Sequence, residues 1–260
     1  MNERGFKTLS KFIACLALSS ICAFSLSLSV NAKDAKELKD GAKGKESAIV
    51  KSLAKPLEST KEVEATAALA EGVKFSYSDE FKKEFANAVK DGRTFIDKYL
   101  RDNPSVETGT LALVSDIDET VLDNRPFMEE KVRTTAKEVD WNGWEEWLKR
   151  AQCAPLKSSA ELLKYARSKG IAVFLITGRQ EHVRRETITN LLKAGINFDG
   201  LYMRKDGDKT DASVMKTEYR KKIEGMGYKI LVNIGDQQSD LAGGFSLCNE
   251  KLPNKMYFIK

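Results

Sequence analysis

Histidine is almost absent from this sequence, since its 260 residues contain one, His182. A single histidine excludes hydrolytic sites that need several imidazoles, such as binuclear metal centres with histidine ligands. Cysteine is also scarce, and only Cys153 and Cys248 lie beyond the first 32 residues. Two cysteines can pair in an oxidising compartment, but their positions in the sequence do not show whether their Cα atoms lie close enough. A Cys153–Cys248 disulfide therefore stays an open question.

An excess of charge of one sign is missing as well. The 43 Lys and Arg residues and the 38 Asp and Glu residues give a net charge of +5. Residues 1–32 hold three of the basic residues and one of the acidic ones, so the rest of the chain carries +3. So small an excess gives no basis for binding a nucleic acid polymer, and we expect none among the partners.

One long apolar run is present, and it lies at the start of the chain. It follows a basic start formed by Arg4, Lys7 and Lys11. Small residues suited to cleavage end it at Ala32, so the pattern predicts a secretory signal peptide over residues 1–32. The run also approaches the length of an uncleaved membrane anchor, an alternative that its five serines disfavour. We expect export to the periplasm or the medium, with no membrane span after cleavage.

The most informative stretch is LALVSDIDETVLDN, residues 111–124. Its apolar beginning, residues 111–115, is typical of a strand buried on both faces. The strand is followed by Asp116 and Asp118, with Glu119 directly behind them. In an extended backbone Asp116 and Asp118 point the same way, and two carboxylates facing one point repel each other. The pair therefore indicates a metal ion, an acid–base couple, or both.

Apolar runs and amphipathic stretches alternate along the rest of the chain. Helices are predicted at residues 81–100, 158–168, 181–194 and 213–225, and further strands at 171–176, 200–203, 229–234 and 255–259. This alternation predicts an α/β domain over residues 76–260 with a parallel sheet. Residues 33–75 have few apolar positions and no strong periodicity, which predicts a poorly ordered leader or a weak helix.

An insertion of about residues 124–157 separates the first strand from the second. It contains all three tryptophans, Trp141, Trp144 and Trp147, whose spacing of three places them along one side of a helix. Two interpretations fit this stripe: a core-facing aromatic face, or a surface on which a substrate stacks.

Polar residues follow the other strands at the points where these end. Thr177 follows the second strand, Asp236 and Asp240 follow the fourth, and the helix between the third and fourth strands carries Lys216. Because the carboxyl ends of parallel strands share one edge of the sheet, these groups can converge with Asp116 and Asp118. Oxygen ligands without histidine or thiolate suit Mg²⁺, which also takes phosphate oxygens.

Four of these segments together resemble the haloacid dehalogenase superfamily. SDIDETVLDN is similar to its first motif, and ITGR, MKTEYR and GDQQSDL are similar to its second, third and fourth. Within the superfamily the chain resembles class C acid phosphatases, plant acid phosphatases and vegetative storage proteins, a likeness that includes the closing KLPNKMYFI. Phe127 departs from the class C pattern, which usually has Tyr there. The resemblance implies a Rossmann-like fold whose parallel sheet is flanked by helices, with a small helical cap and an N-terminal helical segment.

The resemblance also implies a mechanism of Mg²⁺-dependent phosphomonoester hydrolysis. Asp116 would attack phosphorus and form an aspartyl-phosphate, and Asp118 would act as general acid and then as general base. The metal ligands would be Asp116, the Asp118 carbonyl and Asp236, with Asp240 in support. Phosphoryl oxygens would be held by Thr177, the Gly178 amide and Lys216. Arg179 and Arg220 would brace carboxylates.

The resemblance implies a phosphomonoester substrate, with nucleoside monophosphates as one class because members of the family often have nucleotidase activity. Phe127, Trp141 and Trp144 are the candidate specificity residues. The main alternative is a non-catalytic storage or phosphate-binding protein of the same fold, because plant relatives have lost the nucleophile. Asp116 is present here, which favours the enzyme. A receiver domain is excluded because it would carry its phosphoacceptor on a later strand.

Overall fold

The structure is a computed structural model that describes residues 59–134 and 141–259. The predicted signal peptide and its cleavage site lie outside these residues. Within them, no helix has both the length and the apolar character needed to cross a bilayer. The elements are α2 (Ser59–Ser76), α3 (Asp79–Asp102), η1 (Thr108–Thr110), β1 (Leu111–Ser115), β2 (Leu122–Asp123), α4 (Arg125–Thr134), α5 (Trp144–Lys149), β3 (Ala154–Pro155), α6 (Lys157–Ser168), β4 (Ala172–Gln180), η2 (Glu181–Val183), α7 (Arg184–Lys193), β5 (Gly200–Arg204), α8 (Ala212–Gly225), β6 (Lys229–Gly235), α9 (Gln238–Leu241) and β7 (Cys248–Lys251).

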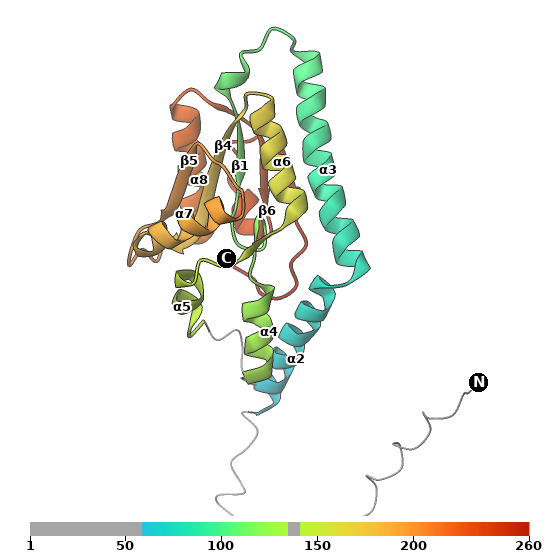
Figure 1. The fold of residues 1–260 in the computed structure, drawn as a ribbon, viewed down its shortest axis with the longest axis vertical. Coiled ribbons are helices and arrows are strands. Elements are labelled where there is room, and N and C mark those ends of the chain that lie inside the picture. Colours follow the sequence, from blue (N-terminus) through green and yellow to red (C-terminus); the bar gives the residue numbers. More distant parts are fainter. Residues whose placement is uncertain (1–58, 135–140, 260) are drawn as a thin grey trace, which may run out of the picture. The chain divides into compact units, whose positions relative to one another are not determined.

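A five-stranded sheet in the order β5-β4-β1-β6-β7 forms the centre of the fold (Figure 1). Every neighbouring pair of its strands is parallel. All five residues of β1 are buried, as the apolar run predicted for a strand covered on both faces. The predicted α/β fold with a parallel sheet is therefore confirmed.

Successive residues of β1 belong to two different hydrophobic cores. Leu111 and Leu113 pack in a cluster with apolar residues of α3, α6 and α7. Ala112 and Val114 pack on the other side with Ile223 of α8. This division follows from the two-residue period of a strand, which sends neighbouring side chains to opposite faces. Helices thus cover both faces, and the polar groups are left to gather where the strands end.

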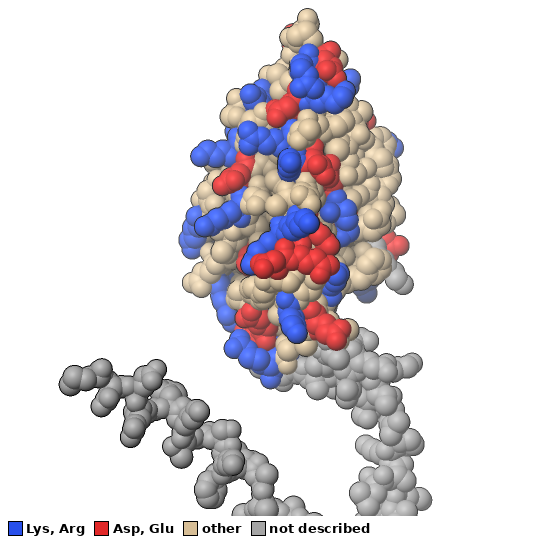
Figure 2. Space-filling view, turned by 90° about the vertical axis from the view of Figure 1, so that its right-hand side faces the viewer, with Lys and Arg blue, Asp and Glu red and all other residues tan. Residues whose placement is uncertain are grey.

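Helix α3 begins at a serine cap and lies along the sheet. The side chain of Ser78 accepts a hydrogen bond from the Phe81 amide, which satisfies one free donor of the first turn. The buried face of the helix includes Phe85 and Ile96, as its periodicity predicted. Figure 2 shows one face of the molecule, on which basic and acidic side chains are interspersed.

The insertion begins and ends at a small two-stranded sheet. β2 and β3 pair antiparallel, with Leu122 opposite Pro155 and Asp123 opposite Ala154. The described part between them consists of the short helices α4 and α5. Both ends of the insertion are therefore fixed close to the loop that carries Asp116 and Asp118.

The region predicted as a leader or weak helix contains α2 in its described part. Leu69 and Val73 of α2 are buried against Met128 of α4 and Met256 near the C-terminus. One compact unit accordingly extends from Leu57 to Lys260, beginning earlier than residue 76. The contact depends on few large apolar residues in an alanine-rich helix, which explains why the periodicity in the sequence was weak.

The predicted final strand is wrong. Residues 255–259 are irregular, and the last strand is β7, whose sequence is CNEK. β7 pairs with β6 at the edge of the sheet and is only partly buried, so it lacks the apolar run by which inner strands are identified. The apolar residues after it have another function, because Met256 packs into a core with α2 and α4.

Candidate active site

Asp116 and Asp118 lie directly beyond β1, where the sequence placed them. The Asp116 amide donates to the Ile234 carbonyl of β6 at 3.0 Å, so the chain keeps its register with β6 for one residue beyond the strand. The Asp116 side chain is 6% exposed, whereas that of Asp118 is 17% exposed. Of the two carboxylates, Asp118 is thus the more accessible from solvent.

Lys216 of α8 joins two of the predicted carboxylates. Its ammonium donates to Asp116 Oδ1 and to Asp240 Oδ1, both at 2.5 Å, and all three side chains are buried. Burial alone lowers the pKa of Lys216, but the two facing carboxylates outweigh burial and the pKa of Lys216 is raised. The lysine therefore stays protonated and provides a fixed positive charge next to Asp116.

Asp236 and Asp240 come from the end of β6 and from α9. Their close packing requires Gly235, since a Cβ there would lie 2.4 Å from the Cβ of Asp240. Burial and the neighbouring Asp240 raise the pKa of Asp236 to about 6, while the amides of Asn254 and Gln237 act in the opposite direction. This carboxylate is buried with amide donors, and it forms no ion pair with a described residue.

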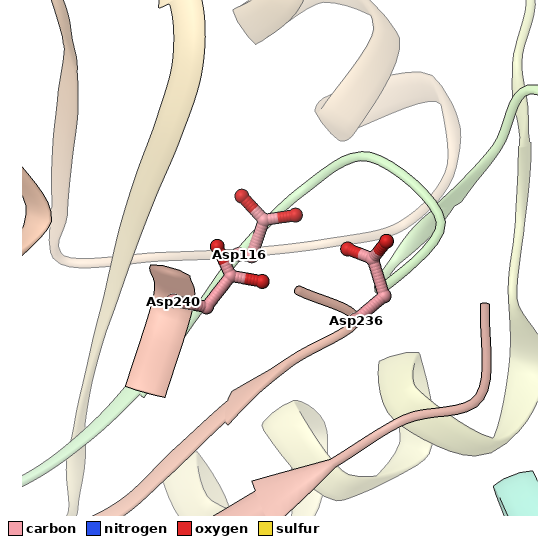
Figure 3. A group of neighbouring side chains, drawn as sticks. All are labelled: Asp116, Asp236 and Asp240. Carbon is pink, nitrogen blue, oxygen red and sulfur yellow. The ribbon is translucent and has the colours of Figure 1, made fainter. Parts of the chain in front are cut away.

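Three carboxylates, those of Asp116, Asp236 and Asp240, point into one space (Figure 3). One oxygen of each lies within 4.8 Å of the others. With Lys216 as the cation paired to them, the group keeps a formal excess of two negative charges, which a divalent cation would neutralise. All the ligands are hard oxygen atoms, the type that Mg²⁺ prefers. The residues present therefore fit a divalent metal site.

Asp118 is held by three neighbours. Arg179 donates to both of its oxygens, with a shortest distance of 2.6 Å from Nη2, and the Asn124 amide donates to Oδ1 at 2.9 Å. The hydroxyl of Thr177 lies 3.4 Å from Oδ2. Arg179 thus braces a carboxylate, as the resemblance implied, and the side chain of Asp118 is fixed next to Thr177.

Two of the three predicted phosphate-binding residues, Thr177 and Gly178, lie at an irregularity of β4. The register of the pairing between β4 and β5 shifts between Thr177 and Gln180, so the strand is irregular in the part that contains Gly178. Gly178 is exposed, and nothing lies within 4 Å of the position that a Cβ would take there. The backbone at Gly178 is therefore open to a ligand beside Asp118.

Arg220 differs from its predicted role. Its guanidinium donates to three main-chain carbonyls, those of Asp240, Ala242 and Gly244, and it pairs with no carboxylate of the described residues. It is buried, and its donors are satisfied by these carbonyls of α9 and of the turn after it. Arg220 therefore supports Asp240 through the backbone, which the side-chain types in the motif could not show.

Sequence reasoning assigned no role to several residues of the site, among them Glu119, Asn124, Asn254 and Tyr257. The buried Glu119 carboxylate accepts from the main-chain N–H of Asn124 at 3.0 Å and from the Tyr257 hydroxyl. Glu119 has a φ of 53°, a left-handed conformation that is rare for a residue with a side chain. Burial, with Asp118 adding to it, raises the pKa of Glu119 well above its usual range. Asn124 ends the first motif, and Asn254 and Tyr257 lie in KLPNKMYFI. The sequence analysis identified both segments, but it did not show that these three side chains bind carboxylates of the site.

The aromatic residues of the insertion form one cluster around Phe127. The ring centroid of Phe127 lies 6.5, 5.1 and 6.1 Å from those of Trp141, Trp144 and Trp147. Phe127 is only 3% exposed, so the prediction that it lines a substrate surface is not supported. Trp141 precedes α5 and is 39% exposed, whereas the other two tryptophans are half-buried within α5. The tryptophans are thus not equivalent. Trp144 and Trp147 lie in one helix, whereas Trp141 lies before it, so the predicted row of three on one helix is not formed.

The two cysteines beyond residue 32 are both free thiols. Cys153 is buried, and its Sγ lies 3.1 Å from Asn124 Oδ1. Burial raises the pKa of Cys153 to about 11, so this thiol is protonated and unreactive. Cys248 lies in β7 and contacts Glu250.

Comparisons with known proteins agree with the fold and the motifs. A family model described as HAD superfamily, subfamily IIIB (acid phosphatase) matches residues 42–260. Acid phosphatase 1 of Solanum lycopersicum is 37% identical over 150 residues, which cover 56% of this chain and 58% of that protein. Vegetative storage protein 1 of Arabidopsis thaliana is 28% identical over 148 residues, 56% of this chain and 54% of that protein. The chain thus matches less than two thirds of the length of either relative.

Solved structures give the same result for the fold. The class C acid phosphatase of Bacillus anthracis, in a crystal structure with tungstate bound, is 25% identical with a TM-score of 0.64. The superposition covers 75% of this chain and 87% of that one.

Proposed function

Because the chain belongs to subfamily IIIB of the HAD superfamily, the acid phosphatases, we propose that it is an exported Mg²⁺-dependent phosphomonoesterase. The observation that carries this proposal is the arrangement at the end of β1. A buried carboxylate, Asp116, lies beside a buried ammonium, and the more accessible Asp118 lies next to it. In this proposal Asp116 is the nucleophile, Lys216 supplies positive charge, and Asp118 is the acid–base group for transfer of a phosphoryl group.

The proposed reaction has two steps. In the first, an Asp116 oxygen attacks phosphorus, the bond to the leaving oxygen breaks, and Asp118 gives its proton to that oxygen. In the second, water attacks the aspartyl-phosphate, Asp118 takes the proton of the water, and inorganic phosphate leaves with Asp116 regenerated. Thr177, the Gly178 amide and Lys216 hold the phosphoryl oxygens and offset their charge. Tungstate, found in the Bacillus anthracis structure, is a tetrahedral oxyanion like phosphate and is consistent with an oxyanion-binding fold.

The metal of this proposal is Mg²⁺, which would be held by Asp116, the Asp118 carbonyl and Asp236, with Asp240 in support. Its chemistry is to supply positive charge to phosphoryl oxygens. The support for Mg²⁺ is the all-oxygen group described above and its two excess negative charges. Export is proposed because the basic start and apolar run within residues 1–32 have the pattern of a secretory signal peptide.

A panel of small phosphomonoesters, assayed at acidic pH with Mg²⁺ and with EDTA, tests the proposed function. We expect hydrolysis with Mg²⁺ and loss of it with EDTA, and activity should return when Mg²⁺ is added in excess. Turnover that persists in metal-free buffer would contradict the metal assignment. A folded protein that binds phosphate but hydrolyses no ester would favour the alternative of a storage or phosphate-binding protein.

The substrates proposed include nucleoside monophosphates, because Trp141 offers an exposed ring near the site. Its ring centroid lies 5.3 Å from that of Tyr257, whose hydroxyl donates to Glu119 beside Asp118. A base stacked on an aromatic side chain gains about 1–3 kcal/mol, so Trp141→Ala should raise KM for a nucleotide by roughly tenfold. KM for a small aliphatic phosphate should stay the same.

Trp147→Ala serves as the comparison for this prediction. The indole N–H of Trp147 donates to Asn124, which in turn donates to Asp118, so its loss should impair every substrate alike. If the ratio of nucleotide to aliphatic kcat/KM in Trp141→Ala equals that of the wild type, Trp141 has a structural role only.

A further inference from the structure

The C-terminal segment beyond β7 extends across the edge of the sheet where the strands end, and it finishes near α5 (Figure 1). Its first residue is anchored to β6, since the Leu252 amide donates to the Gly235 carbonyl at 2.9 Å. Leu252 and Met256 are buried. α2 packs so closely against the segment that a Cβ on Gly72 would lie 2.2 Å from the Lys255 carbonyl oxygen. The segment is therefore part of the packed structure and lies against the site.

One side chain of this segment reaches a proposed metal ligand. Asn254 Nδ2 donates to Asp236 Oδ2 at 2.6 Å, and Gln237 Nε2 donates to the same oxygen at 2.7 Å. Two amide donors occupy both lone pairs of Oδ2. The other oxygen, Oδ1, has one long contact of 3.3 Å with the Thr120 hydroxyl. The two amides thus fix the rotation of the carboxylate and leave Oδ1 as the oxygen able to bind a cation.

The same segment also orients Gln237, the second amide donor to Asp236, and it is held in place by contacts of its own. Gln237 Oε1 accepts from the Ile259 amide at 3.0 Å, so the C-terminal residues orient the side chain of Gln237. Tyr257 donates its hydroxyl to Glu119 and packs its ring on Trp141. Asn254 itself is held by a turn, since its Oδ1 accepts from the Met256 amide at 2.8 Å.

From these contacts we infer that Asn254 is a positioning residue, which orients Asp236 for Mg²⁺ binding. Asn254 is itself held by the Met256 amide, in a segment that the Tyr257 hydroxyl attaches to Glu119. This inference rests on the proposed function, because it assumes that Asp236 is a metal ligand. It assigns a role to the closing segment KLPNKMYFI, to which the proposed reaction gives none. Hydrogen-bond partners of metal ligands typically contribute 10- to 100-fold to metal affinity or activity, which makes the role measurable.

Isothermal titration of the EDTA-treated chain with Mg²⁺ tests the inference without an activity assay. Asn254→Ser keeps a side-chain oxygen that can accept from the Met256 amide, but it removes the amide that reaches Asp236. We expect its Kd for Mg²⁺ to rise by about 10- to 100-fold. The matched control is Asn103→Ser, which removes an exposed amide that donates to the Tyr99 carbonyl at the end of α3. The control should bind Mg²⁺ as the wild type does.

Tyr257→Phe is the second variant, because it removes only the hydroxyl and keeps the ring on Trp141. Loss of this one hydrogen bond should raise the Kd for Mg²⁺ by about 2- to 10-fold. Tyr165→Phe is its control, since the Tyr165 hydroxyl donates to Asp97 on the exposed surface. Thermal denaturation of the metal-free variants separates weaker metal binding from loss of fold.

The outcomes separate this inference from the proposed function. Wild-type affinity in Asn254→Ser, or a loss no larger than in Asn103→Ser, overturns the inference and leaves the proposed function intact. A wild-type protein that binds no Mg²⁺ overturns both. If Asn254→Ser does not fold, Tyr257→Phe decides, and wild-type affinity in that variant overturns the inference.

Discussion

Replacing Asp116 by Asn is expected to lower kcat/KM for phosphomonoesters by about a thousandfold or more. The substitution keeps the shape of the side chain and removes both the nucleophilic oxygen and one negative charge of the metal site. The fold should persist, because Lys216 retains its partner Asp240 at 2.5 Å. Steady-state kinetics together with circular dichroism measure the two effects separately.

Asp79→Asn is the control for that prediction. Asp79 is an exposed residue in the first turn of α3 and pairs with Lys82 at 2.9 Å, away from the site. Its kinetics should equal those of the wild type. Turnover in Asp116→Asn within a few fold of the wild type would show that Asp116 is not the nucleophile.

Asp118→Asn should have an effect that depends on the leaving group. For an alkyl phosphate, whose leaving oxygen needs a proton, kcat should fall by about 10²- to 10⁴-fold, the usual contribution of a general acid. For an activated aryl phosphate the first step needs little protonation, so the loss should be smaller. Since the Asn oxygen can still accept from Arg179, the loop should keep its position.

A comparison of the two ester types for Asp118→Asn supplies the check. Equal losses on the alkyl and aryl esters would mean that Asp118 does not protonate the leaving group. An equal loss would instead suit a role in positioning, through its contacts with Arg179 and Asn124.

The inner strands could be predicted from the sequence because burial leaves a direct trace in composition. β1 and β6 are covered on both faces, so most of their residues are apolar, and the carboxylates that follow mark the ends of the strands. β7 left no such trace, since its residues CNEK at the edge of the sheet alternate between partly buried and exposed. These residues form a strand because their backbone pairs with β6, and not because their side chains are hydrophobic.

The acidic groups of the site could be predicted because each belongs to a short motif at the end of a strand or in a helix. Their hydrogen-bond partners could not, because those contacts join distant segments. Tyr257 and Glu119 lie 138 residues apart, and Asn254 reaches Asp236 across 18 residues from an irregular segment. Amide and hydroxyl groups of this kind are common throughout the sequence, and only the folded chain shows which of them face a carboxylate.

The tryptophans illustrate the same limit. Their spacing could not distinguish a core face from an open surface, and in the structure the three side chains differ in burial. Trp147 is tied to Asn124 through its N–H, whereas Trp141 keeps an exposed ring. The difference arises from Phe127, whose buried ring occupies the centre of the cluster.

Covalent phosphorylation of Asp116 is the central claim, and acid quenching during turnover followed by peptide mass spectrometry measures it directly. Acid preserves an acyl-phosphate, so the peptide that contains residues 111–124 should carry the added mass of one phosphoryl group, with fragment ions that place it on Asp116. The same peptide from Asp116→Asn should carry none. Active turnover without any phosphorylated peptide, or phosphate on another residue, would contradict the mechanism proposed for this site.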